Sequence, residues 1–359
     1  MRDARIVEPA HEPEVVEAGF QPASKGGILP PGWEAGLTGS QGRLPQRFRS
    51  ASRTPSSGCS LPALSSMHPL IQKLVAHAPI ITDGAWGTQL QARGLATGDV
   101  PDSWNLTHGD RVAEVAQAYV EAGSQVILTN TFGANRVRLT EAGLADRAAE
   151  INRKGVEISR AAAQGRALVF ASIGPSGKML LSGDITPEDL GAAFGEQARG
   201  LAAGGADALV VETMSDLEEA KLAVAAARTA GLPVVACTVF DSGKDKDRTM
   251  MGNTPEEVAV ALTAAGADVI GANCGQGIAG FVQICERLHA ATGRPIWIKP
   301  NAGLPEMVEG KVVYRTGPEE FASFVPALVK AGATFIGGCC GTSPEFIRAV
   351  KQELRTTAE

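Results

Sequence analysis

Residues 208–240 read ALVVETMSDLEEAKLAVAAARTAGLPVVACTVF, and this stretch decides the fold. ALVVETM (208–214) and PVVACTVF (233–240) are short apolar runs rich in Val and Thr, which is typical of buried strands. The segment between them opens with SDLEEA (215–220), a polar cap followed by acids, and continues as an alanine-rich helical stretch. A strand, a helix and a second strand in this order predict a βαβ unit with parallel strands.

The same unit recurs along the chain. Eight apolar runs are predicted to be strands, namely 79–85, 125–132, 167–174, 208–214, 233–240, 268–274, 295–302 and 334–340. Helices are expected between them, announced by TPEDL (186–190), TPEEV (254–258) and GPEEF (317–321). Eight units in about 290 residues have the size of a (β/α)8 TIM barrel. We therefore predict a single α/β barrel domain over residues 67–359.

An open, doubly wound sheet is the competing architecture, because periodicity alone does not separate it from a barrel. The count of eight units favours the barrel. The sequence also has no GxGxxG after an early strand and no GxxxxGK[ST], so neither nucleotide-binding fingerprint supports the open sheet.

The composition is that of a globular protein. The chain has 359 residues, of which 44% are hydrophobic and 20% charged, with a formal net charge of −6. Nucleic acids and anionic membranes favour clustered lysine and arginine, so we expect neither as a partner. No apolar run reaches the roughly 18 residues of a transmembrane helix. Six unevenly spaced cysteines do not resemble a secreted disulfide framework, which predicts a cytoplasmic location.

Residues 1–66 differ from the rest of the chain. They are rich in Pro, Gly, Ser and Arg and lack sustained periodicity, which predicts a disordered extension. Met67 precedes the first amphipathic run, HPLIQKLV, and is a candidate for the true start. A transit peptide is the alternative, although acidic residues near the start argue against one.

Polar residues and cysteines follow the predicted strands. A (β/α)8 barrel builds its active site at the carboxyl ends of its strands. The residues at these ends are Asp83, Asn130, Glu212, Cys274, Asn301, Cys339 and Cys340. Because closure of the barrel brings distant strand ends around one mouth, we expect Cys274 to lie near Cys339 and Cys340.

Three cysteines at one mouth predict a zinc site. Zn²⁺ favours thiolate ligands in a tetrahedron, and three protein ligands with one open position are typical of catalytic zinc. FIGGCCGT (335–342) puts Cys339 beside Cys340, so the backbone must turn sharply between or around them. The required backbone angles are open to the flanking glycines, Gly337, Gly338 and Gly341.

A buried cysteine is more often a small apolar residue than a ligand. We assign this role to Cys237 and Cys285, whose neighbours belong to a strand and a helix, and no role to Cys59.

The charged residues at the strand ends allow two interpretations each. Asp83 and Glu212 are expected to bind the ammonium group of a substrate, or else to be solvated rim carboxylates or helix caps. Lys299 is a candidate Schiff-base lysine, as in barrel aldolases. A lysine before Pro300 at a strand end is more often an ordinary rim residue.

Six short motifs follow one another between Ile80 and Arg348. They are DGAWGT (83–88), ASIGPSG (171–177), VVETMSD (210–216), GANC (271–274), KPNAGLP (299–305) and GGCCGT (337–342). In this order they resemble the homocysteine S-methyltransferase family, including the homocysteine-binding module of methionine synthase. GANC and GGCCGT, together with DGAWGT, are highly specific motifs of that family.

The resemblance implies which residues carry the chemistry. The family's barrel holds zinc on three cysteines, which correspond to Cys274, Cys339 and Cys340. Its acids hold the amino acid end of homocysteine, and they correspond to Asp83 and Glu212.

The resemblance extends to neighbouring residues. Asn273, Ser172 and Asn301 lie in matching segments and are expected to bind substrate or to support the residues that do. Lys299 becomes part of a motif without Schiff-base chemistry.

The implied reaction is zinc-dependent S-methylation of homocysteine to methionine. Zinc would hold the thiol as a thiolate, whose sulfur attacks an electrophilic methyl group. Family members take that methyl from a corrinoid recharged by methyltetrahydrofolate, from betaine or from S-methylmethionine. Thr213, after Glu212, resembles the methionine synthase module rather than the betaine enzyme, in which a tyrosine follows the glutamate. We therefore expect a corrinoid donor, and because no DxHxxG signature occurs, cobalamin on a separate protein.

Two other classes of function stay open. One is a barrel lyase or aldolase that uses Lys299. The other is a non-enzymatic zinc-binding or redox-sensing protein in which Cys339 and Cys340 respond to oxidants without turnover of homocysteine. The position of acids and thiols at separate strand ends favours a substrate pocket.

Overall fold

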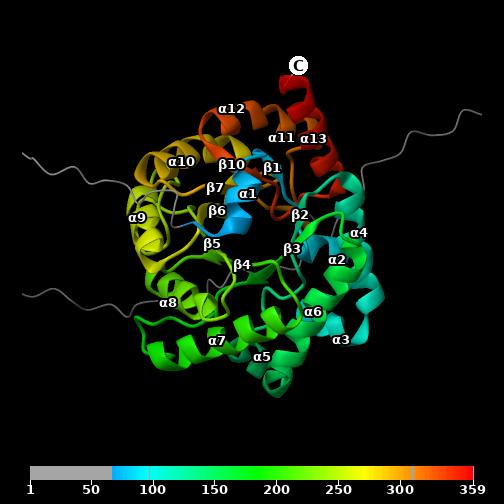
Figure 1. The fold of residues 1–359 in the computed structure, drawn as a ribbon, viewed down its shortest axis with the longest axis vertical. Coiled ribbons are helices and arrows are strands. Elements are labelled where there is room, and N and C mark those ends of the chain that lie inside the picture. Colours follow the sequence, from blue (N-terminus) through cyan, green and yellow to red (C-terminus); the bar gives the residue numbers. More distant parts are fainter. Residues whose placement is uncertain (1–66, 97, 309–310, 359) are drawn as a thin grey trace, which may run out of the picture.

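The protein is described here by a computed structural model covering residues 67–96, 98–308 and 311–358. The predicted extension, residues 1–66, lies outside the described residues. Eight parallel strands form a ring that is surrounded by helices (Figure 1). The strands are β1 (Ile80–Ile81), β2 (Val126–Ile127), β3 (Leu168–Ile173), β4 (Ala208–Met214), β5 (Val234–Thr238), β6 (Val269–Gly277), β7 (Ile296–Asn301) and β10 (Ala333–Ile336). Each overlaps one of the eight predicted runs.

The ring is a nearly closed barrel. The strand order is β1-β10-β7-β6-β5-β4-β3-β2, so β1 and β2 lie at its two ends. Gln125, just before β2, joins them, because its backbone N–H donates to the carbonyl of Ile81 at 2.8 Å and its side-chain oxygen accepts from the N–H of Ile81 at 2.9 Å. The predicted barrel is confirmed, and the open sheet is excluded.

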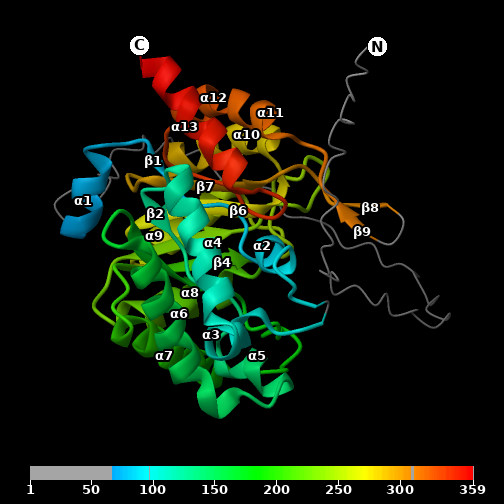
Figure 2. The ribbon, with the colours of Figure 1, turned by 90° about the vertical axis from the view of Figure 1, so that its right-hand side faces the viewer.

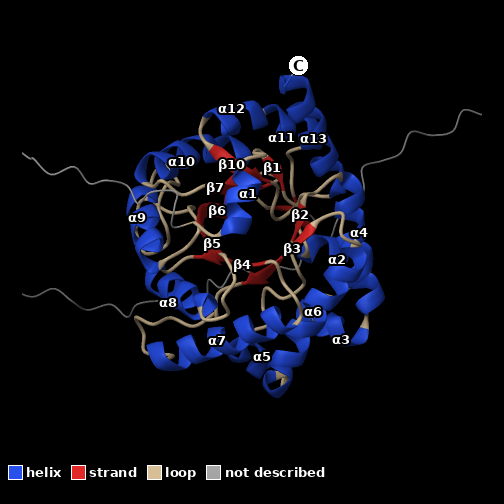
Figure 3. Cartoon of the chain, viewed as in Figure 1, coloured by secondary structure: helices blue, strands red, loops and turns tan. Residues whose placement is uncertain are grey.

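Helices follow the strands along the chain and surround the ring, except α1, which lies over one end of it (Figures 2 and 3). They are α1 (Pro69–Val75), α2 (Gly87–Gln91), α3 (Trp104–Thr107), α4 (Gly109–Ala122), α5 (Arg136–Glu141), α6 (Ala148–Ala163), α7 (Pro187–Ala203), α8 (Leu217–Arg228), α9 (Pro255–Ala265), α10 (Ile278–Ala291), α11 (Pro318–Ser323), α12 (Val325–Lys330) and α13 (Pro344–Ala358). No described helix has the length and hydropathy needed to span a bilayer.

Three of the four predicted helix starts are confirmed by side-chain caps, whereas α11 begins at Pro318, as GPEEF predicts, after Gly317 and without a side-chain cap. The side chain of Thr186 accepts from the N–H of Asp189, and that of Asp216 accepts from the N–H of Glu218. Thr254 forms a capping box at the start of α9. Each cap satisfies backbone donors that the first helical turn leaves unpaired.

Two elements at opposite ends of the barrel complete the fold. An antiparallel hairpin of β8 (Glu306–Val308) and β9 (Lys311–Val313), which the sequence did not predict, follows β7. Helix α1 lies at the other end, where the N–H of His68 donates to the carboxylate of Asp268 at 3.2 Å. Figure 2 shows α1 and the hairpin on opposite sides of the ring.

The interior of the barrel is apolar at the end that α1 closes. It is filled by Met67, Ile71, Ile80, Val126, Leu128, Phe170, Ala208, Val210, Val235, Cys237, Val269, Trp297 and Phe335. A second, larger core lies between the strands and the surrounding helices and contains Cys285. Cys237 and Cys285 are therefore buried apolar residues, as predicted.

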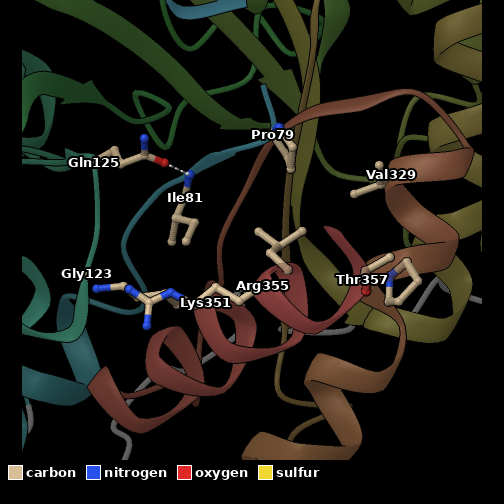
Figure 4. A pocket seen from close by; sticks show the side chains of 10 residues that line it. Pro79, Ile81, Gly123, Gln125, Val329, Lys351, Arg355 and Thr357 are labelled. Carbon is tan, nitrogen blue, oxygen red and sulfur yellow. Dashed lines mark hydrogen bonds between the residues drawn. The ribbon is translucent and has the colours of Figure 1, made fainter. Parts of the chain in front are cut away.

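A pocket of about 610 Å³ lies on the outside of the barrel, near the amino ends of β1 and β2 (Figure 4). It is lined by Pro79, Ile81, Gly123, Gln125 and residues of α12 and α13. None of the predicted site residues lines it. Its position is at the end of the strands away from the predicted site.

Candidate functional site

The three predicted zinc ligands come together at the carboxyl ends of the strands. Cys274 lies on β6, and Cys339 and Cys340 follow β10. Their Sγ atoms all lie within 4.8 Å of one another. Tetrahedral zinc with bonds of about 2.3 Å needs sulfur atoms about 3.8 Å apart, so small side-chain movements bring this cluster to that geometry. The donor set is also the one that zinc prefers.

Left-handed backbone turns Cys274 toward its partners. Its φ is 62° and that of Gly275 is 68°, and the pairing of β6 with β7 shifts between Cys274 and Gly277. A non-glycine residue rarely adopts such a φ, and residues that do so cluster at functional sites. Because a sequence does not display φ, this feature was not predicted.

The glycines around the cysteine pair act in two ways. Gly341 has φ 79°, as predicted. Gly337 and Gly338 do not have positive φ, so the prediction was wrong for them. They are needed for space, since a Cβ at 337 would lie 2.0 Å from Oγ1 of Thr82 and one at 338 would lie 2.4 Å from Oγ1 of Thr342.

Asp83 is completely buried just after β1. One carboxylate oxygen pairs with the ammonium of Lys299. The other accepts hydrogen bonds from Nε1 of Trp86 at 2.8 Å and from the backbone N–H of Leu128 at 2.7 Å. In this structure Asp83 therefore already has three protein donors.

Glu212 projects from β4 and is 6% exposed. It accepts hydrogen bonds from Oγ of Ser172 and, at 3.3 Å, from Nδ2 of Asn273. Burial raises the pKa of Glu212 to about 7; the charge of Lys299 opposes this rise and that of Cys339 adds to it. The carboxyl group of Glu212 therefore ionises near neutral pH, and its ionised form is the better partner for an ammonium group.

Asn273 connects the acid to the thiols. Its side-chain oxygen accepts from the N–H of Thr213 at 2.8 Å, and its Nδ2 donates to Oγ1 of Thr213 at 2.7 Å and lies 3.9 Å from Sγ of Cys339. Thr213 has φ 61°, a strained value for a β-branched residue. Sequence reasoning missed this role of Thr213, and only its position after Glu212 pointed to it.

The remaining predicted residues are placed as follows. Nδ2 of Asn301 donates to the carbonyl of Gly275 at 3.0 Å, beside Cys274. Asn130 donates instead to the carbonyl of Pro101 at 2.7 Å, which fixes a loop. It is buried, and among the described residues its side chain donates hydrogen bonds to Pro101 and Asn105 and not to the acids or the thiols.

Lys299 is not a suitable Schiff-base nucleophile in this structure. Burial disfavours its charge, but the carboxylates of Asp83 and Glu212 outweigh this and raise the pKa of Lys299. A protonated amine cannot attack a carbonyl.

Fold and site together define a class of protein, a (β/α)8 barrel with a three-thiol cluster and an acid at its mouth. The sequence profile described as homocysteine S-methyltransferase matches residues 80–354. The chain belongs to the homocysteine S-methyltransferase family, and the resemblance found in its motifs is confirmed.

Two curated relatives are named methionine synthase. That of Mycobacterium tuberculosis (strain ATCC 25618 / H37Rv) is 35% identical over 76% of this chain and 24% of its own length. That of Mycobacterium leprae (strain TN) is 32% identical over 77% of this chain and 24% of its own length. The chain thus spans about a quarter of the length of these relatives.

Solved structures of one bacterial enzyme share the fold. The metallated form of the homocysteine methyltransferase MmuM from Escherichia coli is 26% identical, with a TM-score of 0.67 over 79% of this chain and 99% of that chain. The oxidized form is 25% identical, with a TM-score of 0.64 over 76% of this chain and 95% of that chain.

Proposed function

We propose that this protein transfers a methyl group to the sulfur of homocysteine and forms methionine, with zinc on Cys274, Cys339 and Cys340. The observation that carries the proposal is the cluster of three Sγ atoms within 4.8 Å at the mouth of the barrel. Similarity to a metallated homocysteine methyltransferase and to methionine synthases supports it.

The residues of the chain prepare the reaction around the metal. Zinc bound to the three cysteines would supply a Lewis acid that keeps a substrate thiol deprotonated at neutral pH. Glu212, held by Ser172 and Asn273, orients the ammonium group of the substrate. Holding the substrate at its amino acid end aligns the sulfur with the incoming methyl group, which lowers the entropic part of the barrier.

We propose a methylated corrinoid, presented by a protein or domain outside the described barrel, as the methyl donor. The names of the two curated relatives support this choice, and the Thr213 that follows Glu212 favours it over betaine. The free thiols also allow a redox-sensing role, since the Sγ atoms are close enough to react with one another after small movements.

One assay tests these proposals. Purified zinc-loaded protein is incubated with homocysteine and, in turn, with methylcobalamin, betaine and S-methylmethionine, and methionine is measured. We expect methionine from methylcobalamin. Formation from another donor alone would correct the donor, and no methionine from any donor at full zinc occupancy would contradict the methyltransferase and favour the sensor.

A further inference from the structure

The pocket of about 610 Å³ at the amino ends of β1 and β2 has the size of a small-molecule site. One wall is formed where Gln125 and Ile81 join β2 to β1. The other walls include residues of α12 and α13 (Figure 4). None of the residues that the proposed methyl transfer uses lines this pocket, so a ligand bound in it would be separate from homocysteine.

The walls of the pocket are mostly apolar. The apolar residues that line it are Pro79, Ile81, Pro326, Val329 and Leu354. Val329 on α12 is 36% exposed, so its side chain is available for contact with a ligand. Removing an alkyl chain from water against such walls is favourable in proportion to the area that is buried. The walls therefore favour a ligand with an apolar body.

The charged groups of the pocket are both cations. Lys351 and Arg355 lie about one turn apart on α13, and both line the pocket (Figure 4). The side-chain oxygen of Gln125 accepts from the N–H of Ile81, and its amide NH2 group adds a further donor. No aspartate or glutamate is among the residues that line the pocket. The lining thus combines apolar walls with an unbalanced positive charge.

Lys351 and Arg355 have no counter-ion in the part of the chain that the structure describes. No ion pair or side-chain hydrogen bond joins either of them to another described residue, whereas Arg348, on the same helix, pairs with Glu345 at 2.7 Å. Two cations four residues apart on a helix also repel each other. Because an anion beside both would offset this repulsion, the charge of the pocket favours an anionic ligand.

Gly123 allows the side chain of Lys351 to lie along the pocket. This glycine ends α4 with φ 111°, a value that favours glycine. A Cβ at position 123 would lie 2.5 Å from Cδ of Lys351 and 2.6 Å from its Nζ, so any larger residue would displace the lysine. The ammonium group lies at the carboxyl end of α4, whose partial negative charge is smaller than the full charge of a carboxylate. Lys351 therefore still has charge to offer to a ligand.

We propose that this pocket binds a small organic anion with an apolar body and a carboxylate at one end, as in a medium-chain fatty acid. The apolar body lies against Ile81, Val329 and Leu354. The carboxylate pairs with Lys351 and Arg355. Apolar walls alone would accept a chain with either charge, and cations alone would accept any small anion, so the combination selects a ligand that has both features.

Three probes separate these two features. Octanoate carries an apolar chain and a carboxylate, octylammonium carries the same chain with the opposite charge, and acetate carries the carboxylate without the chain. Their Kd values are measured by titration calorimetry with the full-length, zinc-loaded protein, each probe below the concentration at which it forms micelles. We expect octanoate to bind at one site, and octylammonium and acetate to bind at least about tenfold more weakly.

Two substitutions in the pocket should weaken the binding of octanoate. Lys351→Met removes one cation and should raise the Kd by about 10- to 100-fold, the effect of losing a charged hydrogen bond. Val329→Glu places a carboxylate on the apolar wall and should raise the Kd by at least about tenfold, because like charges repel. The Tm of each variant is measured to check folding, and Arg355→Met replaces Lys351→Met if that variant does not fold.

Each substitution has a matched control outside the pocket. Val260→Glu changes a valine on α9 that is 59% exposed, and Lys73→Met changes an exposed lysine on α1. Neither residue lines the pocket, so both variants should bind octanoate like the wild type.

Three results would overturn the inference. Octanoate without saturable binding would show that the pocket takes no such ligand. Equal Kd values for octanoate and octylammonium would show apolar adsorption without selection by charge. An unchanged Kd for octanoate in either pocket variant would place its binding elsewhere, and a lower Tm of Lys351→Met with that result would leave the lysine only a structural role at the end of α4. None of these measurements uses homocysteine, so their outcome does not depend on the proposed function.

Discussion

The two ends of the barrel interior use the same strands for different purposes. At the end closed by α1, Trp297 packs on Phe335 and Phe170, with ring centroids 5.2 and 6.0 Å away. One pleat further along β7, about 6.6 Å away, Lys299 meets the acids of the mouth. Side-chain volume decides which residues can fill the apolar end, whereas charge and ligand chemistry decide which residues can act at the mouth. Stability and reactivity are thereby assigned to different layers of one structure.

Backbone strain is also distributed unequally. The non-glycine residues with positive φ in the described chain are Gln164, Thr213, Lys246 and Cys274. Thr213 and Cys274 lie at the mouth, whereas no residue of the apolar interior cluster is among the four. A rigid apolar layer can hold a strained layer above it in one conformation.

The largest expected effect comes from removing a zinc ligand, which should change the chemistry of the mouth and leave the apolar interior as it is. Cys339→Ser should abolish stoichiometric zinc and lower the rate of methionine formation by more than about a hundredfold, because loss of a metal ligand costs more than loss of a residue that only hydrogen-bonds to a ligand, which costs about 10- to 100-fold. The free energy of unfolding of the metal-free protein should change little. Metal analysis, the methionine assay and denaturant unfolding check this. Cys285→Ser, at a buried thiol outside the site, is the control.

The next largest expected effect comes from a substitution in the apolar interior, which should lower stability and leave the site intact. Phe335→Ala should lower the free energy of unfolding by about 3–5 kcal/mol, because it leaves a cavity beside Trp297. Zinc content and homocysteine affinity of the folded fraction should stay at wild-type values. Leu181→Ala, at a side chain 78% exposed, serves as the control and should change little. Loss of zinc by folded Phe335→Ala would show that the layers are not independent.

A smaller effect concerns pH. Since burial raises the pKa of Glu212 to about 7, its carboxyl group is mostly protonated at pH 6 and mostly ionised at pH 8. The ionised form binds the ammonium group, so the affinity ratio of homocysteine to 4-mercaptobutanoate, which lacks the ammonium group, should rise with pH, by about tenfold over this range. Ionisation of the thiol cancels in the ratio. Calorimetry at several pH values measures it, and an equal slope in Glu212→Gln would assign the effect to another group.

The smallest expected effect tests the backbone strain at Thr213. Thr213→Gly should raise the free energy of unfolding by up to about 1 kcal/mol, because glycine tolerates φ 61°. It should also weaken homocysteine binding, because Asn273 loses its acceptor on Oγ1. Thr213→Ala keeps the strain and loses the same hydrogen bond. Thermal unfolding and calorimetry of both variants separate the effect of backbone strain from that of the lost hydrogen bond. Equal free energies of unfolding for the two variants would show that strain at Thr213 does not contribute.

Much of the fold could be predicted because its signals are local. The βα rhythm, the capped helix starts and the eight apolar runs depend on side-chain period and on neighbouring residues. The hairpin of β8 and β9 escaped prediction because each strand has only three residues, β8 is exposed, and neither strand shows an alternation of apolar and polar residues.

The sequence by itself determined the barrel, the family and the presence of acids and thiols at the strand ends, because in a closed parallel barrel every strand end faces the same mouth. Tertiary structure alone decided what each of these groups can do. It buried Asp83 against Lys299, left Glu212 without a counter-ion among the described residues, and required glycine at 337 for space and not for its φ. These outcomes depend on distances between segments far apart in the chain, and no local pattern records such distances.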